Sequence, residues 1–292
     1  MIKYVSAALL SFASLNTFAQ TENSHRGHTR IYFNQLNLPK NTYGLSDSQH
    51  QLTINQRHTW LHSESDLHME VAYEFFVSQF DANNDIFRNA LSQNTPYDYR
   101  LRDINPILTQ TNSDESPLTQ IKQNLDRLYI VKNWAHNKLS VGRQIINFGS
   151  GRMVSPEDVL APFGLMVFET EQRFGIDAIR YQHAFNAIQE LDIGHIAGSE
   201  GYLDRSATYA QFKSYSWSAL MMQFKKHNML GVDIQNECFE WNCWIEGAYV
   251  EMQEDYKYFR WSMGAEKLFF WKGKDFVFLS WNTRNESNTS YR

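Results

Sequence analysis

The stretch Leu67–Phe80 alternates apolar and polar side chains with the clearest period of two in the chain. A period of two places successive side chains on opposite faces of a β-strand. One face would be apolar, whereas the other carries the carboxylates of Glu70 and Glu74. Two carboxylates cannot lie in a dry core without partners, and the length suits a tilted membrane strand of about 9–11 residues. The stretch therefore predicts a strand between lipid and a water-filled interior.

Further segments repeat this alternation less regularly, which predicts thirteen strands with an uncertainty of about two. The connections after the second, fourth and sixth strands are short, whereas those after the third and fifth, at about 81–123 and 149–174, are long. Outer-membrane barrels combine short periplasmic turns with long extracellular loops in this way. We therefore expect an all-β fold, an antiparallel transmembrane β-barrel with about 12–14 strands present. The other predicted strands are 30–38, 51–61, 126–134, 138–148, 177–185, 188–196, 207–213, 218–225, 229–235, 244–252, 256–269 and 276–281.

The N-terminus has the pattern of a secretory signal peptide. Lys3 precedes an apolar stretch from Val5 to Leu15, and the small residues Thr17 and Ala19 are typical of a cleavage site after Ala19. The apolar stretch is too short to span a bilayer. Residues 1–19 are therefore predicted to be removed, and residues 20–292 to form a single outer-membrane barrel domain.

The composition excludes some classes of protein. The mean hydropathy of −0.51 excludes a helical membrane protein. Aromatic residues make up 15% of the chain, which suits a barrel with aromatic belts at the membrane interfaces and equally a secreted β-sandwich. The net charge of −5 gives no reason to expect nucleic acid as a partner.

The C-terminal end departs from the pattern of a complete barrel. An odd number of strands is unusual, because bacterial single-chain barrels have even counts. The final residues, 282–292, are polar and have the composition of a loop. Either the strand count is off by one, or closing strands are absent and the sequence is truncated; we favour the second explanation.

Four short motifs lie close together in the middle of the chain. They are Gly142-Arg143-Gln144, Phe148-Gly149, Ser155-Pro156-Glu157-Asp158 and Gly175-Ile176-Asp177-Ala178-Ile179-Arg180. In these motifs, which cover about a fifth of the chain, the sequence resembles the Gram-negative outer-membrane β-barrels of the porin and alginate-export-like group. The resemblance implies a location in the cell outer membrane and partners that include outer-membrane lipid, the outer-membrane assembly machinery and small solutes.

We expect a porin-like channel for the passive passage of small polar or charged solutes, and we expect no enzymatic activity, cofactor or metal. None of the common hydrolase, metalloprotease or phosphate-loop motifs is present in the sequence. Two alternatives stay open: a membrane-embedded hydrolase of the lipase or protease type, and a structural or nonfunctional truncated barrel.

The candidate site residues line the predicted interior or flank the loop 149–174, which we expect to form the constriction. The apolar centre of this loop, from Val159 to Phe168, favours folding into the barrel mouth. Acidic residues outnumber basic ones on the predicted inner faces, which predicts a weak preference for cations at low salt. The candidates are Arg143, Arg152, Glu157, Asp158, Arg173, Asp177, Arg180, Glu70, Glu74, Glu190, Asp192, Asp233, Arg260 and Glu266.

The chain has two cysteines, Cys238 and Cys243. An exported protein can form disulfides, and the four intervening residues suit a bridge across a hairpin turn. Further cysteine or histidine ligands with the spacing of a zinc site are missing. The pair is therefore a candidate disulfide, with free thiols as the alternative.

Overall fold

The computed structural model has an all-β fold, and its described residues are 10–11, 21–37, 48–80, 98–104, 107–111, 118–151, 155–160, 173–252, 256–271 and 274–288. The chain divides into two compact units. Unit 1 comprises Met1–Tyr97 and Arg102–Ile130, and unit 2 comprises Asp98–Leu101 and Val131–Arg292. Each unit is built from a sheet, and every pairing whose register is described is antiparallel.

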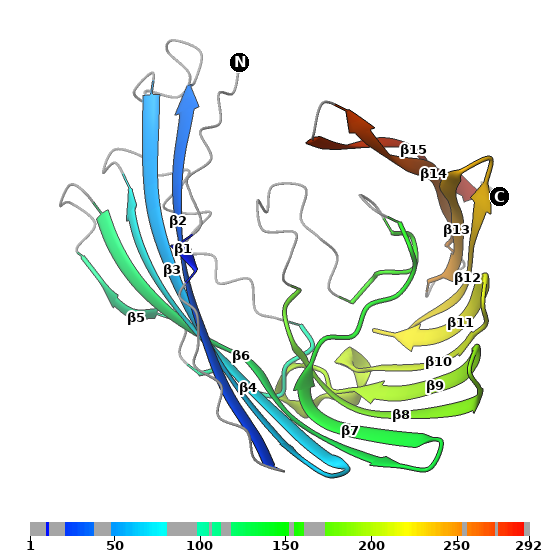
Figure 1. Ribbon diagram of the computed structural model, residues 1–292, viewed down its shortest axis with the longest axis horizontal. Helices are drawn as coiled ribbons and strands as arrows, with labels where there is room; N and C mark the ends of the chain where they lie inside the picture. The colour runs from blue at the N-terminus through cyan, green and yellow to red at the C-terminus, as the bar shows by residue number, and fades with distance from the viewer. Residues whose placement is uncertain are drawn as a thin grey trace. The chain divides into compact units, whose positions relative to one another are not determined.

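Strands that follow one another in the sequence lie side by side in the sheet of each unit. Unit 1 contains β1 (Leu10–Ser11), β2 (Thr21–Asn37), β3 (Ser48–Glu64), β4 (Leu67–Phe80), β5 (Ile107–Gln110), which pairs with β6, and most of β6 (Leu118–Trp134). Unit 2 contains β7 (Asn137–Gln144), β8 (Ile176–Asn186), β9 (Gln189–Ile196), β10 (Ala207–Lys213), β11 (Trp217–Phe224), β12 (His227–Cys238), β13 (Trp241–Glu251), β14 (Lys257–Trp271) and β15 (Lys274–Asn288). Two short 3₁₀ helices, η1 (Ser199–Gly201) and η2 (Leu203–Arg205), connect β9 to β10. Figure 1 shows the strands of unit 2 as a curved sheet.

The prediction of an antiparallel all-β fold is confirmed. Apart from the short β1 and β5, the described residues form thirteen strands, and each of them overlaps one predicted segment. The bounds of β4 and β10 agree with the predicted ones. The signal-peptide prediction falls on residues outside the described ones, except for β1, which pairs with residues 28 and 29 of β2.

The predicted strand 138–148 ends early, because β7 stops at Gln144 and residues 145–148 belong to the loop that follows. The largest differences lie in three other strands, where the missed part is mostly polar and lacks alternation. β2 begins at Thr21, before the predicted start at residue 30. β6 begins at Leu118, inside the segment predicted as a loop at 81–123, and its early part pairs with β5. β15 continues to Asn288, which pairs with Lys257 of β14, so residues 282–288 are not a loop. Backbone hydrogen bonds between strands are indifferent to side-chain polarity, which explains why alternation alone missed these parts.

Tight turns connect several neighbouring strands. Lys225 and Lys226 between β11 and β12, and Phe239 and Glu240 between β12 and β13, all have positive φ, from 44° to 69°. Positive φ at both central residues is the geometry of the two-residue turns that match the twist of a hairpin. A disulfide bridges the two strands beside the turn at Phe239. It joins Cys238 and Cys243, whose Cα atoms are 6.0 Å apart.

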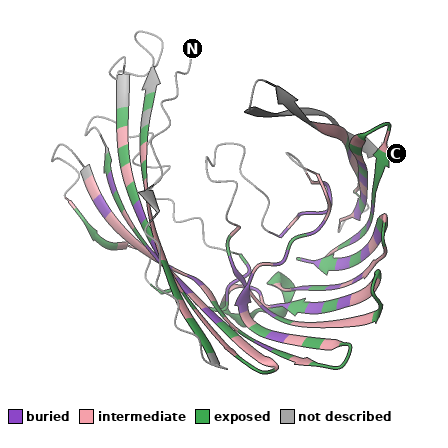
Figure 2. Ribbon diagram, viewed as in Figure 1, coloured by how far each residue is buried: buried purple, intermediate pink, exposed green. Residues whose placement is uncertain are grey.

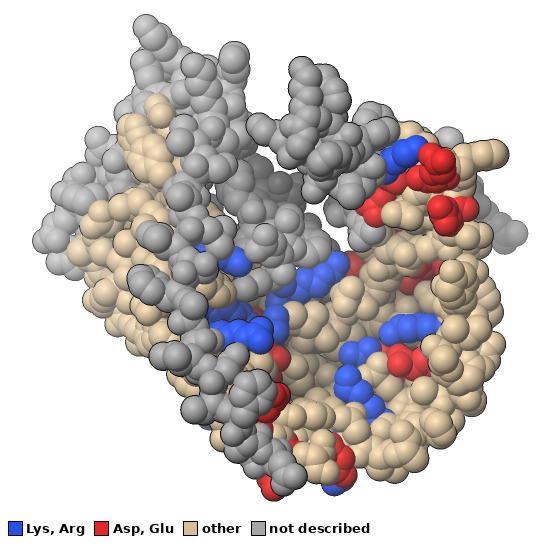
Figure 3. Space-filling model, viewed as in Figure 1, with Lys and Arg blue, Asp and Glu red and all other residues tan. Residues whose placement is uncertain are grey.

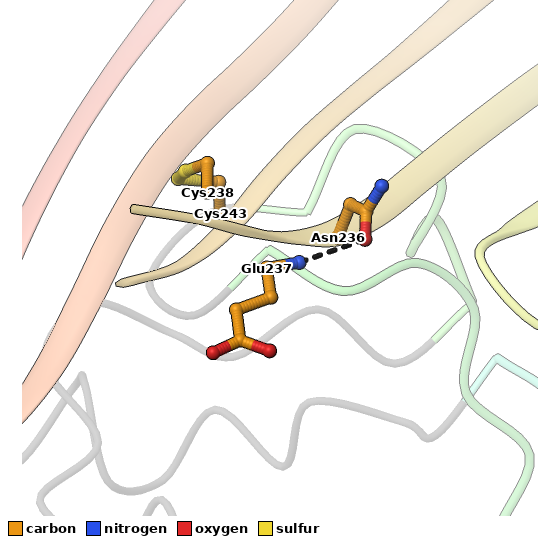
Figure 4. The surroundings of a disulfide bond; sticks show 4 residues. All are labelled: Asn236, Glu237, Cys238 and Cys243. Carbon is orange, nitrogen blue, oxygen red and sulfur yellow. Dashed lines mark hydrogen bonds between the residues drawn. A yellow bond between two sulfur atoms is a disulfide. The ribbon is translucent and has the colours of Figure 1, made fainter. Parts of the chain in front are cut away.

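Figure 4 shows the surroundings of this disulfide at the end of the β12–β13 hairpin. The backbone N–H of Glu237 donates a hydrogen bond to the side-chain oxygen of Asn236, at 2.9 Å. Cys238 is paired with Trp241, and Cys243 with Asn236, in the register of the two strands. The bridge therefore joins two strands that are already hydrogen-bonded to each other.

The polarity of the two strand faces is the reverse of that in a water-soluble protein. On β12, Leu230, Val232 and Ile234 are 54%, 50% and 46% exposed, whereas Gly231 and Asp233 between them are buried. Figure 2 shows buried and exposed residues alternating along the strands of unit 2. Among the described residues, no helix is long and apolar enough to cross a membrane. The exposed face is largely apolar, and the buried face carries charged side chains beside an apolar cluster, which is the arrangement expected of strands whose outer side faces lipid.

Candidate functional site

The buried face of unit 2 is lined by paired charges. Arg180 on β8 donates its guanidinium N–H groups to Asp192 on β9, and Asp192 also accepts from the hydroxyl of Tyr209 at 3.0 Å. The Nζ of Lys213 on β10 lies 3.2 Å from Asp192 and 3.5 Å from Glu190. Figure 3 shows basic and acidic side chains gathered inside the curve of this unit, with mostly uncharged atoms along its outer rim.

The buried face of unit 1 carries a second network of the same kind. Arg57 on β3 lies 2.8 Å from Glu74 and 2.8 Å from Asp126, and all three side chains are buried. Glu70 accepts hydrogen bonds from Arg127 and from the hydroxyl of Tyr129, each at 2.7 Å. Glu70 and Glu74, which the alternation placed on one inner face, thus lie on the buried face with basic partners.

The segment after β7 packs onto the buried face of unit 2. We call its described residues, 145–151 and 155–160, the anchored loop. Ile146, Phe148 and Leu160 are buried in an apolar cluster with side chains from β8 to β13, including Tyr209, whose ring lies 4.8 Å from that of Phe148. Burial of such side chains is favourable because it removes apolar surface from water. The expected apolar centre of the loop, 159–168, lies within the described residues only as far as Leu160.

Two acidic side chains of the wall anchor this loop. Asp233 on β12 and Glu246 on β13 are direct cross-strand partners, and both are buried. Like charges directly opposite each other in a sheet are destabilising unless other groups compensate. In the described part of the chain, neither carboxylate lies within ion-pair distance of a Lys, Arg or His side chain, so the compensation comes from hydrogen-bond donors.

The donors for both carboxylates belong to the anchored loop or lie on β12. Oε1 of Glu246 accepts from the hydroxyl of Ser155 at 2.6 Å and from the backbone N–H of Glu157 at 2.7 Å, and its Oε2 accepts from the backbone N–H of Gly151 at 2.8 Å. Asp233 is hydrogen-bonded to the hydroxyl of Ser150, and accepts from Gln235 at 2.9 Å. Charge-assisted hydrogen bonds of this kind are about twice as strong as neutral ones.

The close approach of the loop depends on a glycine. Gly149 has a φ of +73°, and a side-chain carbon there would collide with the carboxylate of Glu246. Glycine adopts this backbone conformation without the steric cost that a side chain would bring. A larger residue at position 149 would therefore displace the loop from its acceptor.

Glu157 lies beside the two anchoring acids and differs from them. It is fully buried, and neither of its carboxyl oxygens has a hydrogen-bond partner within the described residues. Its carboxyl group packs on Gly231, where an added side-chain carbon would lie 2.5 Å from Oε1. Burial, and then the charges of Glu246 and Asp233, raise the pKa of Glu157 to about 9. The Glu157 carboxyl is therefore neutral at pH 7.

Ion pairs fix the ends of the anchored loop and the segment that follows it. Arg173 is paired with Asp158, and Arg143 on β7 lies 2.8 Å from Asp177 on β8. A guanidinium N–H of Arg260 on β14 donates to the backbone carbonyl of Pro156 at 2.6 Å. These contacts place basic residues against the loop without bringing them to the two anchoring carboxylates.

The structure brings together many, but not all, of the candidate residues. One part of the buried face of unit 2 is lined by Arg143, Asp177, Arg180, Glu190 and Asp192. The anchored loop contains Glu157 and Asp158, and it is contacted by Arg173, Asp233 and Arg260. Glu266 lies further along β14 on the same face as Arg260. Arg152 lies outside the described residues.

Sequence reasoning did not identify the donors of the loop as functional residues. Ser150, Gly151 and Ser155 are small residues in a glycine-containing bend, and that cluster was the available signal of a close backbone approach. Among the described residues, no group of three or more His, Cys, Asp or Glu side chains is placed to hold a metal ion. His195 lies on the exposed face, where it is hydrogen-bonded to Thr208.

Comparison with known proteins gives a distant structural likeness. Neither a protein-family model nor a curated protein sequence matches the chain. One solved structure, described as "Asymmetric conductivity of engineered proteins", is 9% identical to this chain, covers 91% of it and 100% of its own length, and has a TM-score of 0.32. At this TM-score the likeness is too distant to support an argument about fold or function.

Proposed function

We propose that this protein is a β-barrel channel of the outer membrane that lets small polar or charged solutes cross passively. The observation that carries the proposal is the inversion of the two strand faces: the same strands expose apolar residues and bury charged, paired ones. In a membrane barrel the exposed face meets lipid and the charged face lines a polar interior. An interior with fixed charges of both signs suits hydrated solutes better than apolar ones.

The anchored loop supports a channel with a constriction. It is held on the charged face by Glu246 and by the apolar cluster around Phe148, so it occupies space that would otherwise belong to the interior. A loop fixed in this way would narrow the passage and bring Asp158, Arg173 and Arg260 to its edge. Selection of solutes would then depend on the charges closest to the narrowest point.

The proposed partners follow from the same two faces. Outer-membrane lipid would cover the exposed apolar face, and the machinery that inserts barrels into the outer membrane would assemble the chain after export. We propose no catalytic role, because most of the buried charged residues serve one another as partners, and the carboxylates of Asp233 and Glu246 on the wall hold the loop. Solutes would pass without covalent change.

A planar-bilayer recording on the refolded full-length chain tests the proposal. We expect stepwise conductance in a protein whose migration on a gel changes on heating, as is usual for folded barrels. Reversal potentials in a salt gradient should show a weak preference for cations that fades towards about 1 M salt, where the Debye length is only about 3 Å. Recovery of the native protein wholly in the soluble periplasmic fraction, or folded protein in bilayers without conductance, would refute the proposal.

A further inference from the structure

We propose that the anchored loop is a proton-dependent latch, which stays on the inner wall while the Glu157 carboxyl carries a proton and leaves the wall when that proton is lost. The channel proposal does not require the side chain of Glu157. The backbone N–H of Glu157 holds the loop to Glu246, while its own side chain is buried beside the same carboxylate.

The geometry leaves an ionised Glu157 without a compensating contact. Both of its carboxyl oxygens are buried and lack hydrogen-bond partners within the described residues. A buried charge without a partner is strongly unfavourable, so the group keeps its proton or leaves the site. The carboxyl rests on Gly231, two residues before Asp233 on the same face of β12, so it sits at the anchoring pair.

The charged groups around Glu157 come from three strands and from the loop itself. Asp233 on β12 and Glu246 on β13 raise the free energy of the ionised form. Arg260 on β14 donates an N–H to the carbonyl of Pro156, the residue before Glu157. Asp158, the next residue in the loop, is paired with Arg173. Ionisation of Glu157 would therefore place three carboxylates together.

The dependence on pH follows from the two states of the loop. In the latched state the pKa of Glu157 is raised to about 9, mainly by burial, whereas a glutamate in water has its ordinary value of 4.5. Between these two values the latched state binds a proton that the released state lacks, so the ratio of released to latched loop rises up to about tenfold per pH unit. The contribution of Glu157 to this pH dependence levels off below about pH 4.5 and above about pH 9.

The physiological consequence of the latch rests on the proposed channel function. A loop held to the wall narrows the passage, and a released loop would change both its width and its charge. The passage would thus respond to alkaline conditions. The release itself is a property of the folded protein and can be measured without any conductance.

Hydrogen–deuterium exchange of the full-length protein in detergent micelles tests the latch directly. The readout is the protection of the backbone amides of Gly151 and Glu157, corrected for the intrinsic effect of pH on exchange. Between pH 6 and pH 8 the wild-type protein should lose up to about 100-fold of this protection, which is tenfold per unit. The variant Glu157→Gln has a neutral side chain of the same shape, and its protection should stay constant over this range.

A matched control removes a carboxyl from the same buried face without touching the loop. Glu190→Gln should keep the wild-type dependence on pH, because Glu190 contacts Gln182 and Lys213. Wild-type protection that does not change between pH 6 and pH 8 would overturn the latch even if Glu157→Gln failed to fold. Equal pH dependence in wild type and Glu157→Gln would also overturn it. Bilayer recordings separate the two proposals. Conductance in a protein whose loop protection does not depend on pH would refute the latch alone. Loop protection that depends on pH, in a protein without conductance, would refute the channel alone.

Discussion

We expect a large effect on the anchored loop from substitution of Glu246, because its carboxylate accepts three hydrogen bonds from this loop, about ninety residues away in the sequence. The substitution Glu246→Gln keeps the shape of the side chain and removes its charge. The amide oxygen can still accept from Ser155 and Glu157. The amide nitrogen, a donor, would face the N–H of Gly151 and leave it unsatisfied.

The magnitude can be estimated from these contacts. Hydrogen bonds to charged groups contribute about 1.5–3 kcal/mol each, and neutral ones about 0.5–1.5 kcal/mol. Replacing three of the first kind by two of the second costs about 3–6 kcal/mol. Relief of the burial cost of a carboxylate beside Asp233 offsets part of this. We expect the loop to be held less tightly by about 2–4 kcal/mol.

The assay is exchange protection of the Gly151 and Glu157 amides at pH 6, in micelles. A loss of about 2–4 kcal/mol corresponds to a fall in protection of roughly 30- to 1000-fold, since about 1.4 kcal/mol is tenfold. The control Glu190→Gln should change this protection by less than about fivefold, because partly exposed ion pairs contribute about 0–1 kcal/mol. Unchanged protection in Glu246→Gln would show that the loop is held by its apolar side chains alone.

Three further predictions concern the wall. Val232→Arg, on the exposed face, should lower the free energy of unfolding in bilayers by about 2–4 kcal/mol, measured by urea titration. Asn236→Arg, on the same face near the turn, should cost at most about 1 kcal/mol. Equal costs for the two variants would argue against a lipid-facing surface. Arg57→Ala leaves Glu74 and Asp126 buried without their shared partner and should cost about 3–5 kcal/mol, whereas a loss below about 1 kcal/mol would mean that water reaches both carboxylates. The double change of Cys238 and Cys243 to Ser should lower the free energy of unfolding by about 2 kcal/mol, as expected for a short disulfide loop, and leave bilayer conductance unaltered; a changed conductance would contradict a purely local role.

Much of the fold could be predicted from local pattern. Leu67–Phe80 and Ala207–Lys213 have the predicted bounds because their side chains alternate from end to end. The first residues of β2, the first half of β6 and the end of β15 were missed. Those segments are mostly polar or lack regular alternation, so their strand structure depends on the backbone of a neighbouring strand. A pattern within one segment contains no information about such a neighbour.

The candidate site divides in the same way. Alternation placed Glu70, Glu74, Asp192 and Asp233 on the inner faces, and the structure buries all four side chains there. Alternation did not indicate that the Glu246 carboxylate accepts hydrogen bonds from the hydroxyl of Ser155 and from two backbone amides of the loop. Nor did it indicate that Glu157 lacks a partner while its backbone anchors the loop.

The sequence by itself determined the strand class, the approximate strand number and the face of the charged side chains on the regularly alternating strands, because these follow from the two-residue period of a β-strand. Only the tertiary structure decided which charges are paired, which carboxylates hold the loop and which one keeps a proton. Those properties depend on distances between residues far apart in the chain. Such distances are set when strands pair and the loop folds back onto their charged face.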